Sequence, residues 1–311
     1  MSWDPEVLSR VRHLHLRART LTESLMMGEH RSRRVGQATL FADYQEYVPG
    51  MDMRHFDWKV LAKSDRRVVK RFETETDLPC TVVLDLSGDL ATGETGRGGY
   101  PDLDHSKAGY AITLAATLLY FMHRHSEPVG LEVIAGEPTA GAPPYRSLPC
   151  KSGRNHLQLI FMVLASAKPG GQAGLAKSLL RVGGQTPRRS FTAIITDGME
   201  EPSTWLPGLA AFAKRGTDVR LLHLFDRGEF RLSFNRPAMF YSPEGGDDLA
   251  IDPAGARTAF AEVVEEYVRE VYSGTVRWGG LYVPTATDAP MENIIRRAIH
   301  AAPTPLEAVW A

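Results

Sequence analysis

The chain has 311 residues, of which 43% are hydrophobic and 23% charged, as in an ordinary globular protein with a substantial core. Its formal net charge is −1, so overall charge does not favour nucleic acid or a membrane surface as a partner. The two cysteines are too few for a disulfide framework, which predicts reduced thiols in a cytoplasmic protein. Residues 1–12 lack the apolar stretch of a signal peptide, and the longest apolar run, 108–122, is too short for a membrane span.

The first predicted element is an N-terminal helix over residues 1–28. Asp4 and Pro5 are typical of a helix start, apolar residues follow at helical spacing, and Gly28 ends the pattern. Residues 29–78 then mix turn residues, aromatic residues and charges. We expect this stretch to be strand-rich and to pack on the core of the protein.

Part of this stretch is basic, since residues 54–71 contain seven Lys or Arg against two Asp. One interpretation is a nucleic-acid groove that also uses Arg31, Arg33 and Arg34. The other is a polar clasp in which nearby aspartates pair with the arginines. Acidic residues nearly balance the basic ones over the first 80 residues, so no broad basic field exists and the clasp is favoured.

From residue 79 to residue 311, apolar runs alternate with amphipathic segments. Continuous apolar runs of the kind found in strands buried on both faces lie at 81–86, 129–135, 191–196 and 219–225. Helices are expected between and after these strands, at 104–125, 154–167, 175–180, 205–214, from 252 onward, and at 288–300. The alternation predicts an α/β fold with a mainly parallel central sheet flanked by helices.

Three of the predicted strands end in an aspartate, namely Asp85, Asp197 and Asp226. Ligands of open parallel sheets bind beyond the carboxyl ends of the strands, although an aspartate there also commonly caps a turn. Ser87 and Asp89 add further oxygen groups after the first strand, and oxygen ligands of this kind suit Mg²⁺. The residues therefore indicate a site for a cation or a polar ligand at this edge.

Three segments together resemble a von Willebrand factor A domain with its metal-ion-dependent adhesion site: DLSGD at 85–89, KPGGQ at 168–172 and TDG at 196–198. The resemblance implies a Rossmann-type fold. It also implies a site for Mg²⁺ or another divalent cation, built from Asp85, Ser87, Asp89, Gln172 and Asp197. Asp89 stands where the pattern has a second serine, and Gln172 where it has a threonine. Two outcomes stay open, a bound cation or a degenerate site held by hydrogen bonds.

An upstream segment resembles the domain-of-unknown-function-58 family, whose members usually show the core Arg-x-Tyr-x-Pro-Gly-Asp-Asp/Glu-x-Arg-x-Ile-Asp-Trp. Residues 44–58 read YQEYVPGMDMRHFDW, with Met51 where an acidic residue is usual. The residues that match the core form a structural family motif: Tyr47, Pro49, Gly50, Asp52, Arg54, Asp57 and Trp58. We expect the last three of these to pack on the α/β domain, with Arg54 bonded to a carboxylate or to backbone carbonyls.

The resemblance implies a non-enzymatic protein-interaction module that works beside MoxR-type AAA+ ATPases in chaperone-like complex assembly. We expect the partner to bind the loops 85–89, 170–174 and 197–202 through a rim of residues: Gly88, Gly170, Gly171, Gly198, Glu200 and Glu201. One alternative is a metal-dependent hydrolase that uses Asp85, Asp89 and Asp197, but no HExxH or GxSxG motif supports it. The other is nucleic-acid binding through the basic N-terminal segment.

Overall fold

The computed structural model describes residues 5–32, 41–48, 56–64, 66–72, 78–91, 102–135, 147–171, 174–228, 238–240, 249–251 and 253–300. The chain divides into two compact units. The larger unit consists of Met1–Leu25 and Leu78–Ala311, and the smaller one of Met26–Asp77. In the described part of the chain, no helix is both long and apolar enough to cross a membrane.

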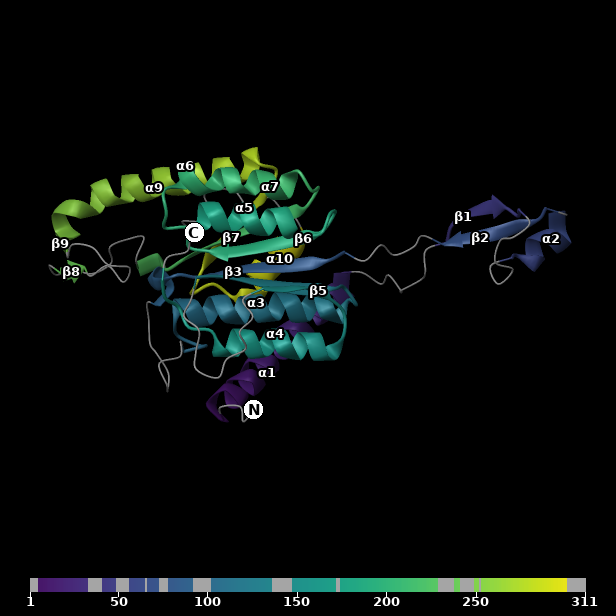
Figure 1. Cartoon of the computed structure of the whole chain (residues 1–311), viewed down its shortest axis with the longest axis horizontal. Helices are drawn as coiled ribbons and strands as arrows, with labels where there is room; N and C mark the ends of the chain where they lie inside the picture. The colour runs from purple at the N-terminus through teal and green to yellow at the C-terminus, as the bar shows by residue number, and fades with distance from the viewer. Residues whose placement is uncertain are drawn as a thin grey trace. The chain divides into compact units, whose positions relative to one another are not determined.

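A six-stranded sheet in the order β10-β7-β6-β3-β4-β5 forms the centre of the larger unit (Figure 1). Its strands are β3 (Cys80–Leu86), β4 (Val129–Ala135), β5 (Ser147–Lys151), β6 (Phe191–Thr196), β7 (Asp218–Phe225) and β10 (Leu281–Ala286). Neighbouring strands are parallel except for β4 and β5, which are antiparallel. Every residue of β3 and β6 is buried, because helices cover both faces. The predicted mainly parallel sheet is confirmed, and β7, β6 and β3 are adjacent.

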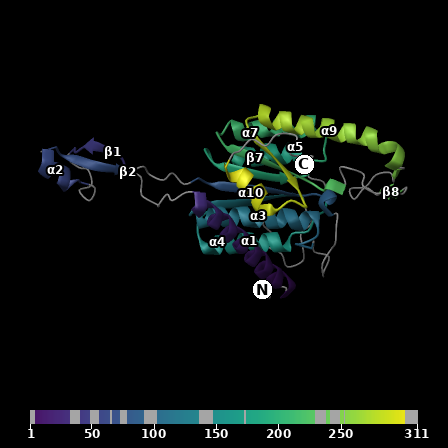
Figure 2. The ribbon, with the colours of Figure 1, turned by 180° about the vertical axis from the view of Figure 1, so that it is seen from behind.

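Helices cover the sheet on two sides (Figures 1 and 2). On one side lie α3 (Lys107–Arg124), α4 (Arg154–Ser166) and α10 (Met291–His300). On the other lie α5 (Leu175–Gln185), α6 (Pro202–Trp205), α7 (Ala210–Ala213) and α9 (Pro253–Arg277).

Outside α3 and α4 lies α1 (Pro5–Ser32), of which the part up to Leu25 belongs to the larger unit. Arg10 Nε donates to the carbonyl of Ala165, and Arg17 Nη1 donates to that of Leu103, each at 2.8 Å. The side chains of Leu14 and Ala18 are fully buried. The predicted N-terminal helix is therefore present, but it continues past Gly28 to Ser32. Its buried apolar positions pack on the α/β core.

Some elements differ from the prediction. The expected helix over 205–214 is split into the end of α6, a 3-10 turn η4 (Leu206–Leu209) and α7. Pro207 lacks a backbone N–H, which weakens a continuous helix here. Strand β10 was not expected. It contains Pro284, which removes one backbone hydrogen-bond donor from the strand. The sheet tolerates this loss because β10 is an edge strand, with β7 as its neighbour in the described sheet. Strands β5, β8 (Ala238–Phe240) and β9 (Leu249–Ile251) were also missed.

The described part of the smaller unit contains β1 (Phe41–Glu46), β2 (Val68–Phe72) and α2 (Trp58–Ser64). The two strands pair antiparallel. Asp57 caps α2, since its Oδ1 accepts from the backbone N–H of Lys59 at 2.9 Å and of Val60 at 3.2 Å. The backbone N–H of Tyr47 donates to Arg67, and the Trp58 ring lies 4.6 Å from that of Phe56. The packing of this unit on the α/β domain stays a prediction.

Candidate functional site

Asp85 lies at the carboxyl end of β3 with both carboxylate oxygens engaged. Its Oδ1 accepts from the backbone N–H of Ser87 at 2.9 Å, and its Oδ2 accepts from the hydroxyl of Thr196 at 2.7 Å. The Thr196 hydroxyl in turn accepts from the N–H of Gly198. Burial, and then the charge of Asp197, raise the pKa of the Asp85 carboxyl to about 7, although the hydrogen bonds from Thr196 and Ser87 lower it.

Asp197 follows β6 and faces a buried lysine. The Nζ of Lys107 lies 3.0 Å from Asp197 Oδ2, and the two side chains are only 4% and 2% exposed. Lys107 is the first residue of α3, whose N-terminus is capped by the Ser106 hydroxyl accepting from the N–H of Gly109. The cap holds the start of α3 in place, so the ammonium lies beside the carboxylate at the edge of the sheet.

A histidine and two tyrosines form the layer beneath this ion pair. His223 on β7 is 1% exposed, with Nε2 at 3.0 Å from the carbonyl oxygen of Asp197 and Nδ1 at 2.8 Å from the hydroxyl of Tyr282. The hydroxyl of Tyr267 donates to the carbonyl of Gly198 at 2.5 Å. These bonds satisfy backbone carbonyls that would otherwise be buried without partners, and they fix the loop after β6.

Three loops lie above the sheet edge, and two of them are bonded to each other. We call the residues 87–89, 170–171 and 198–201 of these loops the rim. The N–H of Gly88 donates to the carbonyl of Gly171, and the N–H of Gly170 to that of Leu86, each at 2.9 Å. Glu200 Oε1 accepts from the N–H of Leu175 at 2.9 Å. Gly198 has a φ of +61°, a conformation that glycine adopts without strain.

The structure brings only some of the predicted site residues together. Asp85, Ser87 and Asp197 share one buried cluster, Asp89 is half-buried on the turn η2 (Gly88–Ala91), and Glu201 is exposed. Asp226 instead closes a turn, with its Oδ1 accepting from the N–H of Gly228 at 2.7 Å. Several predicted residues lie outside the described part of the chain: Gln172, Pro49, Gly50, Asp52 and Arg54.

The described residues do not fit the divalent cation that the resemblance implies. Both oxygens of Asp85 accept hydrogen bonds, and Asp197 faces an ammonium group at 3.0 Å. A metal ion between these carboxylates would be repelled by Lys107 at close range. Within the described ranges, no three His, Cys, Asp or Glu side chains are grouped so as to hold a metal.

Sequence reasoning missed Lys107 and His223. A signal for Lys107 exists, because it begins a stretch of the predicted helix that is otherwise uncharged as far as Met122. A charge in that position is either exposed or paired. His223 gives no such signal, since a histidine within an apolar strand run is commonly a satisfied core residue.

The burial of His223 predicts a pH dependence of stability. Burial lowers the pKa of His223 to about 4 from an ordinary value of 6.5, despite the nearby Asp197, and Lys107 lowers it further. In the unfolded chain His223 therefore binds a proton near pH 6.5, whereas in the folded protein it binds one only near pH 4. As pH falls through this window, His223 removes about 3 kcal/mol from the free energy of unfolding.

The measurement is urea denaturation of wild type and His223→Gln at a series of pH values. Asp85, whose raised pKa has the opposite effect on stability, is present in both proteins and cancels in the comparison. The other titratable groups around His223 are also present in both proteins, so their effects on stability cancel: Tyr267, Tyr282, Lys107 and Asp197. We expect the two stabilities to converge as pH falls from 6.5 to 4. If the two curves of stability against pH stay parallel, His223 is not a buried neutral histidine in the folded protein.

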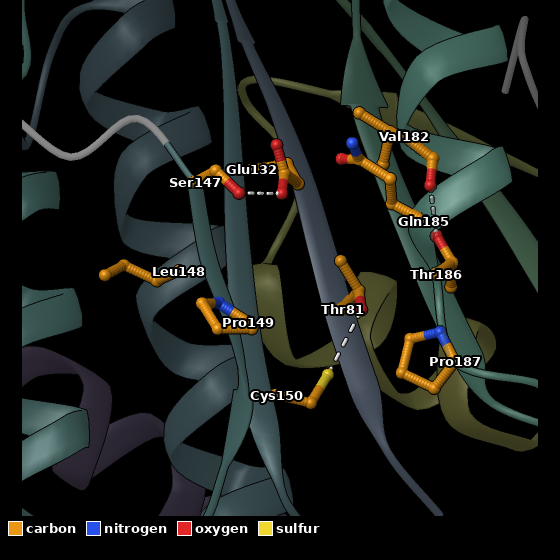
Figure 3. Close-up of a pocket in the computed structure, with 10 residues that line it drawn as sticks. All are labelled: Thr81, Glu132, Ser147, Leu148, Pro149, Cys150, Val182, Gln185, Thr186 and Pro187. Carbon is orange, nitrogen blue, oxygen red and sulfur yellow. Dashed lines mark hydrogen bonds between the residues drawn. The ribbon is translucent and has the colours of Figure 1, made fainter.

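A separate cavity of about 210 Å³ lies between β5, the first half of β3 and the end of α5 (Figure 3). Five of its polar side chains are already paired with one another or with the backbone. The Ser147 hydroxyl donates to Glu132, Thr81 Oγ1 lies 3.3 Å from Cys150 Sγ, and the Thr186 hydroxyl donates to the carbonyl of Val182. Burial raises the pKa of the Cys150 thiol, which disfavours the reactive thiolate. We assign no site to this cavity.

The family profile described as "Protein of unknown function DUF58" matches residues 43–270. The chain belongs to this family. The expected DUF58 membership is therefore confirmed. Uncharacterized proteins of Mycobacterium tuberculosis and Mycobacterium bovis are 23% identical to this DUF58 chain over 282 residues, which cover 89% of this chain and 83% of each relative.

Solved structures give a likeness of fold alone. BatB from Bacteroides thetaiotaomicron is 15% identical, with a TM-score of 0.40 over 72% of this DUF58 chain and 98% of BatB. A von Willebrand factor type A structure from Catenulispora acidiphila is 10% identical, with a TM-score of 0.39 over 75% of this chain and 42% of that one.

Proposed function

We propose that this DUF58 protein is a non-enzymatic protein-interaction module that binds its partner through the rim. The observation that carries the proposal is the pair of backbone bonds from Gly88 to Gly171 and from Gly170 to Leu86, which tie the first two loops of the rim together. The third loop is joined to the start of α5 by Glu200, which accepts from the N–H of Leu175. A recognition surface fixed before binding loses less conformational entropy when the partner arrives. Loops on a rigid sheet can carry recognition without disturbing the core.

The burial of the carboxylates supports a binding role over hydrolysis. Asp85 and Asp197 are each 1% exposed, and each is engaged by hydrogen bonds or by the lysine. A hydrolase would need at least one of them to reach a water molecule and a substrate. The outer residues of the rim are instead the ones that a partner can touch, among them Gly171, Met199 and Glu201.

The proposal includes a site that works without a metal, in which the ammonium of Lys107 supplies the positive charge. Its support is the 3.0 Å contact with Asp197 and the near-complete burial of both side chains. The positive charge is thereby fixed inside the protein and is not presented to a partner's carboxylate. Recognition then depends on the outer residues of the rim.

These outer residues define the chemistry of the partner. Met199 is 45% exposed, Glu201 is exposed, and the half-buried Glu200 and Asp89 lie on the same rim. An acidic rim around an apolar residue fits a partner surface with Lys or Arg around a small apolar pocket. The resemblance noted from the sequence favours a MoxR-type AAA+ ATPase as that partner.

The test measures the affinity of the purified protein for the MoxR-type ATPase of the same organism by calorimetry. We expect Glu201→Lys combined with Met199→Ala to weaken binding about tenfold or more, since it reverses a charge and removes an apolar contact. Glu265→Lys on the solvent face of α9 is the matched charge reversal and should leave affinity unchanged. EDTA should have no effect. Equal loss in both variants, or binding that EDTA abolishes, would contradict the proposal.

A further inference from the structure

A cleft on the opposite side of α3 from the sheet gathers basic side chains from three helices. It lies between α1, α3 and α4 in the larger unit and has a volume of about 780 Å³. This volume falls within the range of small-molecule sites, about 300–1,000 Å³. Arg12 comes from α1, His123 and Arg124 from the end of α3, and Arg154 from the start of α4.

Among the residues that the structure describes, three of the arginines in the cleft have no acidic partner. Arg19 pairs with Glu23 at 2.8 Å, the one acidic residue of the lining. Across the described parts of the chain, no carboxylate forms an ion pair with Arg12, Arg124 or Arg154, and all three are exposed. Guanidinium groups that converge without a counter-charge repel one another unless an anion binds between them.

The start of α4 adds to the positive potential. Arg154 is the first residue of this 13-residue helix, where the partial positive charge of the helix dipole makes a cation unfavourable. Gly153 precedes it and offers no side chain to cap the first N–H groups. Desolvation, followed by the charges of nearby arginines, lowers the pKa of His15 and of His123, although the side chain of His15 is largely exposed. The charge of Arg154 acts on both imidazoles.

The floor of the cleft is aromatic and apolar. The ring of His15 lies 5.3 Å from those of Tyr120 and Phe161, and these two lie 6.4 Å apart. Phe161 and Leu157 are buried beneath the basic groups. A cleft with such a floor and with arginines from three helices fits a compact ligand better than an extended nucleic acid, which needs a continuous basic surface.

We propose that this cleft binds a compact polyanion of the di- and triphosphate class through Arg12, Arg124 and Arg154. Each guanidinium can donate two parallel N–H bonds to one phosphate group. The histidines supply further hydrogen bonds to phosphate oxygens, and the accessible rings of His15 and Tyr120 can pack on a ring where the ligand has one. This binding is separate from the rim and does not depend on the partner proposed there.

The experiment titrates the full chain with inorganic tripolyphosphate and with ATP by calorimetry, in low salt and with EDTA present. We expect saturable binding of both. Arg124→Gln combined with Arg154→Gln should weaken it about tenfold or more, because each lost arginine removes charged hydrogen bonds. Arg188→Gln combined with Arg189→Gln removes the same charge from an exposed turn outside the cleft and should leave affinity unchanged.

The two probes separate the sources of the phosphate. Tighter binding of ATP than of tripolyphosphate would place its base against the rings of His15 and Tyr120, and equal binding would assign recognition to phosphate alone. Both results support the cleft. Absence of saturable binding at millimolar concentration of either probe would overturn the proposal, as would equal loss in the two double variants. Binding of an oligo-aspartate peptide or of single-stranded DNA in place of both probes would also overturn it.

Discussion

Replacing Lys107 by methionine should lower the free energy of unfolding by about 3–5 kcal/mol, because the change leaves a buried carboxylate without its counter-charge. Methionine keeps most of the side-chain volume, so the loss reports charge and not a cavity. Asp197 is 2% exposed in its side chain and lies next to Asp85 in the same cluster, so water cannot replace the ammonium. Urea denaturation at neutral pH measures the effect.

Two controls separate the ion pair from a general intolerance of substitution. Lys177→Met on the exposed face of α5 should change stability by less than about 0.5 kcal/mol. The double variant Lys107→Met with Asp197→Asn removes both charges and should be more stable than Lys107→Met alone. A double variant as unstable as the sum of the singles would show that the two charges do not interact.

A second substitution of Lys107 tests whether its ammonium group takes the place of a metal ion. Lys107→Ala leaves carboxylates around an empty space, so we expect millimolar Mg²⁺ or Mn²⁺ to raise its melting temperature and wild type to show no shift. If wild type is stabilised instead, and Asp85→Ala removes that stabilisation, the protein binds a metal and the lysine does not replace it. This readout is independent of any partner.

Gly109→Ala should destabilise the protein by about 3 kcal/mol or more, as expected for an overpacked backbone contact. A Cβ at this position of α3 would lie 1.8 Å from the carbonyl oxygen of Asp102 and 2.7 Å from the Cα of Leu103. That carbonyl accepts hydrogen bonds from the N–H and the hydroxyl of Ser106, so the turn before α3 cannot move away cheaply. Any movement of this turn would also displace Lys107 at the start of α3.

Gly184→Ala is the matched control, because a Cβ there meets nothing within 4 Å. It lies near the end of α5, where alanine should raise stability by about 0.5 kcal/mol through the lower entropy of the unfolded chain. Thermal and urea denaturation should therefore show a lower free energy of unfolding for Gly109→Ala and a higher one for Gly184→Ala. A mild effect of Gly109→Ala would mean that the start of α3 is less tightly held than the contacts indicate.

The amino-acid sequence was sufficient to predict the sheet and the position of its functional edge. Strands buried on both faces need continuous apolar runs, and those at 81–86, 191–196 and 219–225 stand out from their surroundings. Parallel strands place their carboxyl ends at one edge, so Asp85 and Asp197 could be assigned to the same place before the structure was known. The edge strand β10 could not be predicted, because its short run is interrupted by Pro284 and depends on pairing with β7.

The sequence by itself therefore determined the fold class, the family and the two aspartates at the sheet edge, because these follow from local periodicity and from contiguous motifs. Only the tertiary structure decided which charges meet. Lys107 begins a helix far from Asp197 in the chain, and packing of α3 against the sheet brings its ammonium within 3.0 Å. The arginines of the cleft likewise come from three separate helices. Electrostatic energy depends on distance and burial in space, and neither can be read from the order of residues.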